Sequence, residues 1–181
     1  MTPPELALHS GGVGVVERHR PSRVWVRWLP PVVAAVMVVV SVVLRSRGVD
    51  LPAQLYRVAL FHRDGLTLWD SQWYGGHWTL NYSVIFAPLA GSLGLHLTAA
   101  LSGALAALAF DRLVIGHFGP TARAGSIVFA LGTLVQVAIG QLPFLMGEAL
   151  ALTALWAASK RWWPVAVVMA IGTALASPLA G

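Results

Sequence analysis

The chain has 181 residues, of which 57% are hydrophobic and 10% are charged, and its mean hydropathy is +0.72. Soluble domains are about 25% charged and about 45–50% apolar, so this composition excludes an ordinary soluble protein and predicts an all-α, polytopic membrane helix bundle. The absence of cysteine excludes disulfides, thiolate catalysis and cysteine-ligated metal sites. The formal net charge is +5, but the arginines flank apolar segments instead of forming one basic face, which disfavours nucleic-acid binding.

Residues 1–27 combine Pro, Gly, Ser and His with several arginines, and they predict a disordered, basic cytoplasmic tail. A transmembrane domain is expected over residues 28–181. Its first span covers about 28–44, "WLPPVVAAVMVVVSVVL", with two prolines in the first turn, where a missing N–H costs little. The flank "LRSRGVD" contains no small-x-small cleavage site, so we expect an uncleaved anchor and not a signal peptide.

Residues 45–81 are predicted to form the one sizeable loop outside the cytoplasm. Asp50 followed by Leu51 and Pro52 is a helix-start signal. At 100° per residue the following segment separates a mainly polar side from a mainly apolar one, which predicts an interfacial helix with its polar side facing outward or toward a partner loop. The mainly polar side carries Asp50, Gln54, Arg57, Phe61 and Asp64.

Four further spans are predicted after a short outer helix at about 82–89. They cover about 93–110, 121–140, 144–159 and 164–180, which makes about five spans in all. Asp111 and Arg112 are interpreted as a topological stop at the inner end of the 93–110 span. The sequence stops directly after the fifth span, and we expect it to be the N-terminal part of a longer membrane protein.

The distribution of Lys and Arg predicts the orientation. With the N-terminus in the cytoplasm, eight of these residues flank the spans on the inside and four on the outside, as the positive-inside rule requires of a multi-pass plasma-membrane protein. This orientation places the segment "LWDSQWYGGHW", residues 68–78, on the outer face.

That outer segment gathers three Trp, one Tyr, an Asp, a Gln and a His within eleven residues. Asp70 has two interpretations: an Asx-turn residue between headgroup-anchoring tryptophans, or a carboxylate that faces a ligand. The flat faces of Trp73 and Tyr74 suit sugar rings, and Gln72 and His77 suit their hydroxyl groups. No HxH or HxxxH spacing supports a metal site, although a divalent metal remains an option.

Two more carboxylates are candidates at the outer face. Asp50 is predicted either to cap the interfacial helix or to act as a general base at the membrane surface, and the two roles are compatible. Glu148 stands in an otherwise apolar helical run, where a charge costs roughly 2.5–3.5 kcal/mol at the bilayer centre, so a functional role is one hypothesis. The alternatives are that Glu148 extends to the nearby interface or pairs with an outer-loop arginine.

The segments "GVDLPAQLYR", directly after the first span, and "LWDSQWYGGH…YSVIFAPLAG" resemble the GT-C-type membrane glycosyltransferases, especially a poorly characterised actinobacterial branch. "GQLPFLMGEALAL" and "ALASPLAG" also look like membrane segments of that branch. The resemblance implies a polyprenyl-phosphate sugar donor, transfer on the outer face and a catalytic carboxylate in the first outer loop, at Asp50. Asp70 matches a loop acidic residue that only some members use. Such enzymes usually have eight or more spans, which exceeds the five predicted here.

We therefore expect a cell-envelope glycosyltransferase with a polyprenyl-phosphate-linked sugar and membrane lipid as partners. Asp50 is the predicted general base, with Asp70 as the second catalytic candidate, and either Arg57 or Arg63 offsets the charge of the leaving phosphate. The expected substrate-binding residues are Gln54, Arg57, Gln72, Trp73, Tyr74, His77 and Glu148. The alternatives are a non-catalytic membrane protein or a transporter subunit whose aromatic loop binds a glycan, a lipid or a partner. The sequence specifies neither a cofactor nor an oligomeric state.

Overall fold

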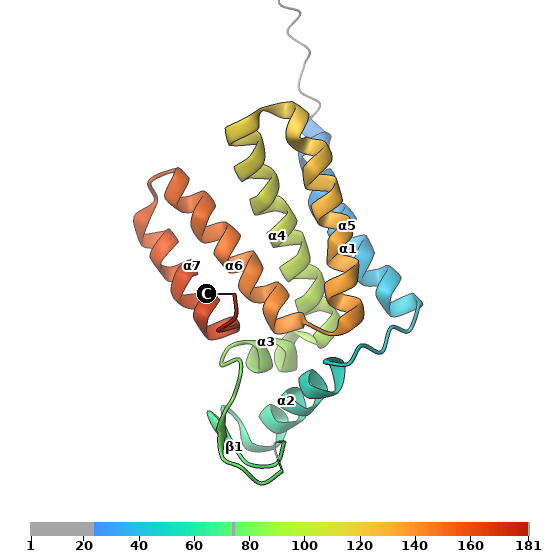
Figure 1. The fold of residues 1–181 in the computed structure, drawn as a ribbon, viewed down its shortest axis with the longest axis vertical. Coiled ribbons are helices and arrows are strands. Elements are labelled where there is room, and N and C mark those ends of the chain that lie inside the picture. Colours follow the sequence, from blue (N-terminus) through green and yellow to red (C-terminus); the bar gives the residue numbers. More distant parts are fainter. Residues whose placement is uncertain (1–23, 74, 181) are drawn as a thin grey trace, which may run out of the picture.

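The computed structural model describes residues 24–73 and 75–180, and it confirms the predicted all-α helical bundle (Figure 1). The described elements are η1 (Val24–Trp28), α1 (Leu29–Val43), α2 (Leu51–Asp64), β1 (Trp69–Asp70), β2 (Thr79–Leu80), α3 (Phe86–Leu93), α4 (Leu95–Phe118), η2 (Pro120–Ala122), α5 (Arg123–Ile139), α6 (Leu142–Ser159) and α7 (Trp163–Ala176). The helix α2 and the short β1–β2 hairpin lie together beyond one end of the bundle (Figure 1).

The protein is a multi-pass membrane protein. Within the described part of the chain, four helical segments are long and apolar enough to cross a bilayer: Trp25–Val43, Leu95–Phe118, Pro120–Ile139 and Leu142–Ser159. The fifth predicted span corresponds to α7, whose 14 residues extend only about 21 Å, less than the ~30 Å of a hydrocarbon core. The helix α7 ends because Ser177 adopts an extended backbone and its hydroxyl bonds to that of Tyr82 at 2.6 Å.

The helix α4 is central to the bundle. It packs against α1 and α5 on one side and against α6 on the other, and α6 also packs along α7. Small residues allow close approach: a Cβ placed on Gly103 would lie 3.7–3.8 Å from Thr133 and Ala34, which is ordinary van der Waals contact. Large apolar side chains on the outward faces remain exposed, as expected where lipid and not water is the solvent.

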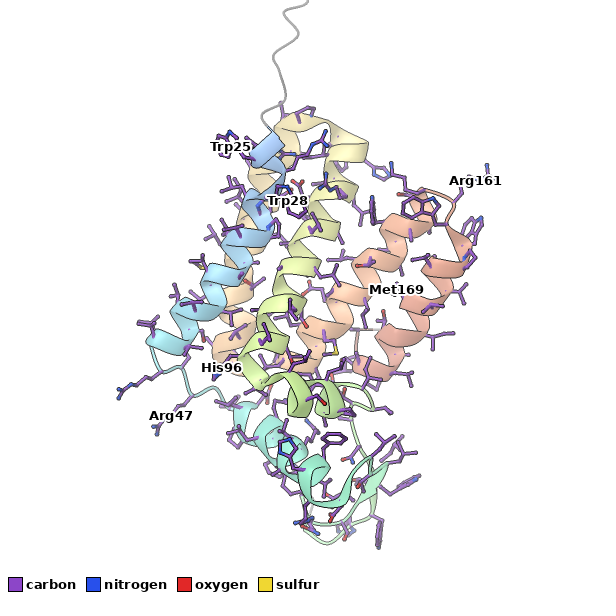
Figure 2. The ribbon with its side chains drawn as sticks, turned by 180° about the vertical axis from the view of Figure 1, so that it is seen from behind. Trp25, Trp28, Arg47, His96, Arg161 and Met169 are labelled. Carbon is purple, nitrogen blue, oxygen red and sulfur yellow. The ribbon has the colours of Figure 1, made fainter. Side chains whose placement is uncertain are left out.

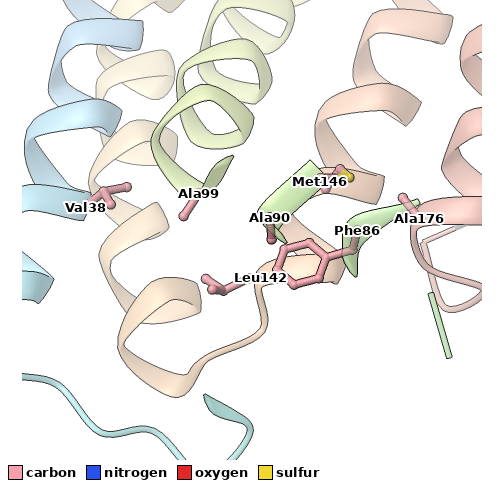
Figure 3. Close-up of a cluster of buried hydrophobic side chains, with 7 residues drawn as sticks. All are labelled: Val38, Phe86, Ala90, Ala99, Leu142, Met146 and Ala176. Atoms are coloured by element: carbon pink, nitrogen blue, oxygen red, sulfur yellow. The ribbon is translucent and has the colours of Figure 1, made fainter. Parts of the chain in front are cut away.

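The end of the bundle next to α2 has its own apolar core (Figure 3). Phe86 and Ala90 of the short helix α3 are fully or almost fully buried there, among residues of four other helices. These partners are Val38, Ala99, Leu142, Met146 and Ala176. The helix α3 therefore closes this end of the bundle and fixes the chain that returns from the outer loop.

Backbone contacts attach the start of α2 to the turn between α5 and α6. The Asp50 N–H donates to the Ile139 carbonyl at 3.1 Å. A Cβ placed on Gly48 would overlap the Ile139 carbonyl group, and one on Gly140 would lie 2.5 Å from the Leu51 nitrogen. Gly140 also has φ +92°, a conformation that L side chains rarely adopt. Two glycines thus permit the approach that positions α2.

The helix α4 does not end at Asp111, the residue interpreted as a topological stop, but continues through it to Phe118. The side chain of Asp111 is completely buried, and one carboxylate oxygen lies 3.4 Å from Nε of Arg123 at the start of α5. The ion pair across the α4–α5 turn offsets the charge, so the helix need not stop there.

Candidate functional site

The polar outer segment folds back onto α2. The β1–β2 pairing sets Trp69 opposite Leu80 and Asp70 opposite Thr79. Asp70 is buried there, with 6% of its surface exposed, and its Oδ2 accepts a 2.5 Å hydrogen bond from the Tyr56 hydroxyl of α2. Its Oδ1 accepts the Gln72 N–H at 3.3 Å, which is the Asx-turn geometry of the structural interpretation. Asp70 thereby connects the loop to the helix.

Tyr56 is a residue of this site that the sequence analysis missed. Burial raises its pKa to about 12, and the hydrogen bond to Asp70 and the charge of that carboxylate act in the same direction. Tyr56 therefore stays protonated and remains a hydrogen-bond donor throughout the physiological pH range. Its ring also packs against Trp73, with ring centroids 5.1 Å apart and planes tilted by 34°. The one feature of the sequence that points to Tyr56 is its place between Gln54 and Arg57, in a helix with both polar and apolar residues.

The arginines that were expected to face a phosphate have partners in the loop or helix. Nη2 of Arg63 lies 2.8 Å from Oδ2 of Asp64 and 3.3 Å from the Gln72 side-chain oxygen. The Arg63 hydrogen bond lowers the pKa of Asp64. Arg57 donates to the buried Gln54 at 2.9 Å and lies over the ring of Tyr82, with 5.4 Å to its centroid. Tyr56 and Arg63, the α2 residues that bond to the loop, lie outside the predicted polar side of the helix. Of that side, Arg57 contacts Tyr82 at the end of the loop.

The tip of the loop contains the remaining candidates. His77 is exposed, and Gly75 and Gly76 have φ of 62° and 92°, as expected for a tight glycine turn. Tyr74 lies outside the described residues. Two water-sized spaces, of about 10 and 20 Å³, lie between α2 and the described part of the loop. The described loop residues thus pack against α2 at these places.

Asp50 occupies the first position before α2 but does not cap it. In residues 24–73 and 75–180, its carboxylate accepts no capping hydrogen bond. Two features explain this: its backbone is helical (φ −91°, ψ −13°) and not extended as in most caps, and Pro52 lacks the N–H that a cap would bind. The capping prediction is therefore wrong, and a half-buried carboxylate remains at the membrane end of α2.

A cavity of about 380 Å³ opens directly beside this position. Leu51, the residue after Asp50, forms part of its wall, and the end of α1, the start of α4 and the α5–α6 region form the rest. Arg45, Arg47 and His96 supply its cationic or potentially cationic groups. Figure 2 shows Arg47 and His96 at the same end of the bundle, opposite Trp25 and Arg161. We refer to this space as the outer cavity.

From the sequence alone, Arg45 and Arg47 are only topological charges, and His96 carries no functional signal. Arg45 has φ +53°, in the left-handed region. It closes α1 in a Schellman-like turn, in which its N–H donates to Val42 at 3.0 Å and the next N–H donates to Ser41 at 3.1 Å. Glycine is the usual residue at such a position, and a left-handed arginine costs about 1–2 kcal/mol. The pair of arginines two residues apart, just before Asp50, was the available signal.

Glu148 lies near the same end of the bundle. Its Oε2 accepts a 2.7 Å hydrogen bond from the side-chain amide of Gln136, one turn before Ile139 in α5. The predicted pairing with an outer-loop arginine is therefore replaced by a pairing with a glutamine of the next helix.

The candidate residues thus fall into two groups. The first group lies at the face between α2 and the loop and consists of Asp70, Gln72, Trp73, Gln54 and Arg57. The second contains Asp50, which lies next to the outer cavity, about 9 Å along α2 from Tyr56. In the described part of the chain, no three His, Asp or Glu side chains are grouped to hold a metal ion.

Comparisons of the chain with models of protein families, with curated proteins and with solved structures found no match.

Proposed function

We propose that this protein is a GT-C-like membrane glycosyltransferase that transfers a sugar from a polyprenyl-phosphate donor at the outer face of the plasma membrane, with its N-terminus in the cytoplasm. The observation that carries the proposal is the juxtaposition of an uncapped, half-buried carboxylate, Asp50, with the outer cavity and its arginines. The motif resemblance of the first outer loop supports the same assignment.

The proposed chemistry uses the two features together. Asp50 accepts the proton of the acceptor hydroxyl as that oxygen attacks the anomeric carbon of the donor sugar. The bond between that carbon and the phosphate oxygen breaks, and the phosphate leaves with the bonding electron pair. Arg45 and Arg47 stabilise the additional negative charge, and the His96 ring supplies a further hydrogen-bond donor. A single base opposite the leaving group gives inversion at the anomeric carbon.

Asp70 has a different proposed role. Since its carboxylate is buried and bonded to Tyr56, it serves as a positioning residue that holds the loop on α2 and so fixes the direction of that helix. Arg57 and Gln54 contribute to the same face. The acceptor would approach from the loop side of Asp50, and the lipid tail of the donor would lie along the apolar wall of the outer cavity, which includes Leu95 and Val137.

A second candidate function is non-catalytic binding of a glycan or a partner by the loop. The observation that favours it is the exposure of three loop tryptophans, Trp69, Trp73 and Trp78, at 56%, 41% and 73%. Isolated exposed aromatics suit sugar rings or headgroups, and this function needs no base. It predicts that Trp73→Ala impairs the protein, whereas Asp50→Asn leaves it unchanged.

The test is an activity assay of the purified chain in lipid nanodiscs with a short-chain polyprenyl-phosphate-linked sugar and a cell-envelope acceptor fraction. Release of polyprenyl phosphate is measured for the wild type, for Asp50→Asn and for the matched control Asp64→Asn, an exposed carboxylate on the same helix. Loss of a general base should lower the rate about 10²–10⁴-fold in Asp50→Asn only. An unchanged rate in Asp50→Asn would remove the central residue of the proposal.

A measurement of donor binding distinguishes loss of the base from loss of the groups that bind the phosphate. Asp50→Asn should bind the donor normally, whereas Arg45→Gln together with Arg47→Gln should weaken donor binding by at least about tenfold. A wild-type chain that neither binds nor turns over the donor, but binds glycans through Trp73, would favour the second function.

A further inference from the structure

A second large cavity lies at the other end of the bundle, away from α2 and the outer loop. Its volume is about 1200 Å³, above the roughly 300–1,000 Å³ of pockets for drug-sized ligands. Residues of η1, α4 and α6 form its walls. We call it the basic-end cavity, because most of its charged residues are cationic. Its position is independent of the site proposed for sugar transfer.

The charges around this cavity are unbalanced. Arg27, Arg112, Arg123 and Lys160 line it, and Asp111 is the only carboxylate among its described lining residues. Arg123 already pairs with Asp111 at 3.4 Å. The side chains of Arg27, Arg112 and Lys160 form no hydrogen bond or ion pair within residues 24–73 and 75–180. Three cations thus surround a cavity at the edge of an apolar bundle.

The rest of the cavity wall is apolar and deep. Leu105, Leu108 and Ile115 of α4 line it, and the ten residue steps from Leu105 to Ile115 extend about 15 Å along the helix axis. This length is about half of a ~30 Å hydrocarbon core, so the groove reaches from the basic end to the depth of one leaflet. Trp156 also lines the cavity, and its ring meets that of Trp162 edge-on at 5.7 Å, a pairing typical of the headgroup level.

We propose that the basic-end cavity binds one anionic phospholipid from the adjacent leaflet. The lipid phosphate lies among Arg27, Arg112 and Lys160, and an acyl chain follows the Leu105–Ile115 side of α4. Charge complementarity favours this occupant over two others. A zwitterionic lipid would bring its own cation toward the three basic side chains. An apolar helix would remove all three from water without supplying a counter-charge. An anionic lipid provides both the charge and the apolar length that the cavity requires.

The experiment is native mass spectrometry of the purified chain, released from nanodiscs that contain equal amounts of phosphatidylglycerol and phosphatidylcholine. The wild type should retain one phosphatidylglycerol per chain in preference to phosphatidylcholine. The variant Arg112→Gln with Lys160→Gln should reduce that retention by about tenfold or more, since each basic group near a bilayer surface contributes about a factor of five to ten. Arg161→Gln is the matched control, because Arg161 is the next basic residue but does not line the cavity.

A second measurement tests the location of the lipid. Brominated acyl chains quench nearby tryptophan fluorescence, so brominated phosphatidylglycerol should quench the wild type more than brominated phosphatidylcholine does, and Trp156→Phe should remove most of that difference. If the double variant fails to fold, as judged by circular dichroism and gel filtration, the single exposed change Lys160→Gln replaces it. Equal retention of the two lipids would overturn the proposal. A second protein chain that protects the cavity from lipid would overturn it as well.

Discussion

The phenol of Tyr56 donates a 2.5 Å hydrogen bond to the buried carboxylate of Asp70, and this contact joins the outer loop to the helix α2. The ring of the same tyrosine packs against the ring of Trp73 in the loop. One residue of the helix therefore holds both the acidic and the aromatic groups of the loop. The proposed base, Asp50, lies about two turns earlier on that helix, so the orientation of α2 links the loop to the outer cavity.

Replacing Tyr56 by Phe is expected to release the loop. The change keeps the ring but leaves a buried carboxylate oxygen without its donor, which costs about 1–3 kcal/mol. Hydrogen exchange of backbone amides in residues 66–82 should become about tenfold faster or more, while the spans remain protected. Asp64→Asn, an exposed change on the same helix, should leave the exchange of the loop unaltered. Unchanged protection in Tyr56→Phe would show that the loop is held by other contacts.

Loop docking is expected to depend on pH only in the alkaline range. The pKa of Tyr56 rises from 10.0 to about 12 because of burial and of its bond to Asp70. A raised folded-state pKa means that the contribution to stability is fully present below about pH 10 and is lost as the pH rises toward 12. Tyrosinate absorbance of the wild type minus that of Tyr56→Phe should therefore titrate above the usual range. A difference curve centred at pH 10 would contradict this prediction.

The close contact between the α1–α2 linker and the α5–α6 turn is expected to be intolerant of side chains. A Cβ at Gly48 overlaps the Ile139 carbonyl, so Gly48→Ala must separate the two segments, at a cost of about 1–3 kcal/mol. Thermal unfolding should begin at a lower temperature, and the rate of sugar transfer should fall because Asp50 moves with the linker.

Gly132 provides the control for that prediction. It lies in the middle of α5, and a Cβ there meets nothing within 4 Å among the described residues. Gly132→Ala should therefore be neutral or stabilise the helix by roughly 0.5–1 kcal/mol. Equal melting temperatures for Gly48→Ala and Gly132→Ala would mean that the linker contact contributes nothing to the fold.

The sequence predicted the helices well, because hydropathy and the positions of Pro and Gly are local signals. The start of α2 after Asp50 is one example. Asp111 shows where local signals fail. A charged residue after an apolar run indicates a stop, but its partner Arg123 belongs to the next helix, and the burial of the pair depends on how the two helices pack.

The candidate site was predicted less completely for the same reason. Asp70 and Tyr56 are 14 residues apart, and they meet only because the loop folds back onto α2. His96 joins Arg45 and Arg47 only because α4 begins beside the end of α1. Residue types identified the outer loop as the polar region, whereas the two separate groups within it depend on tertiary contacts that no short motif encodes.

Arg45 yields a prediction in which stability and function move in opposite directions. Its left-handed backbone, φ +53°, favours glycine, so Arg45→Gly should raise the melting temperature by relieving up to about 1 kcal/mol of strain. The same change removes a cation from the outer cavity and should weaken donor binding by about tenfold. Arg47→Gly is the matched control: it removes a charge from the same cavity without relieving a positive φ, so it should weaken binding and lower stability. If Arg45→Gly binds the donor as tightly as the wild type, the left-handed arginine is a feature of the turn alone and the outer cavity holds its phosphate without it.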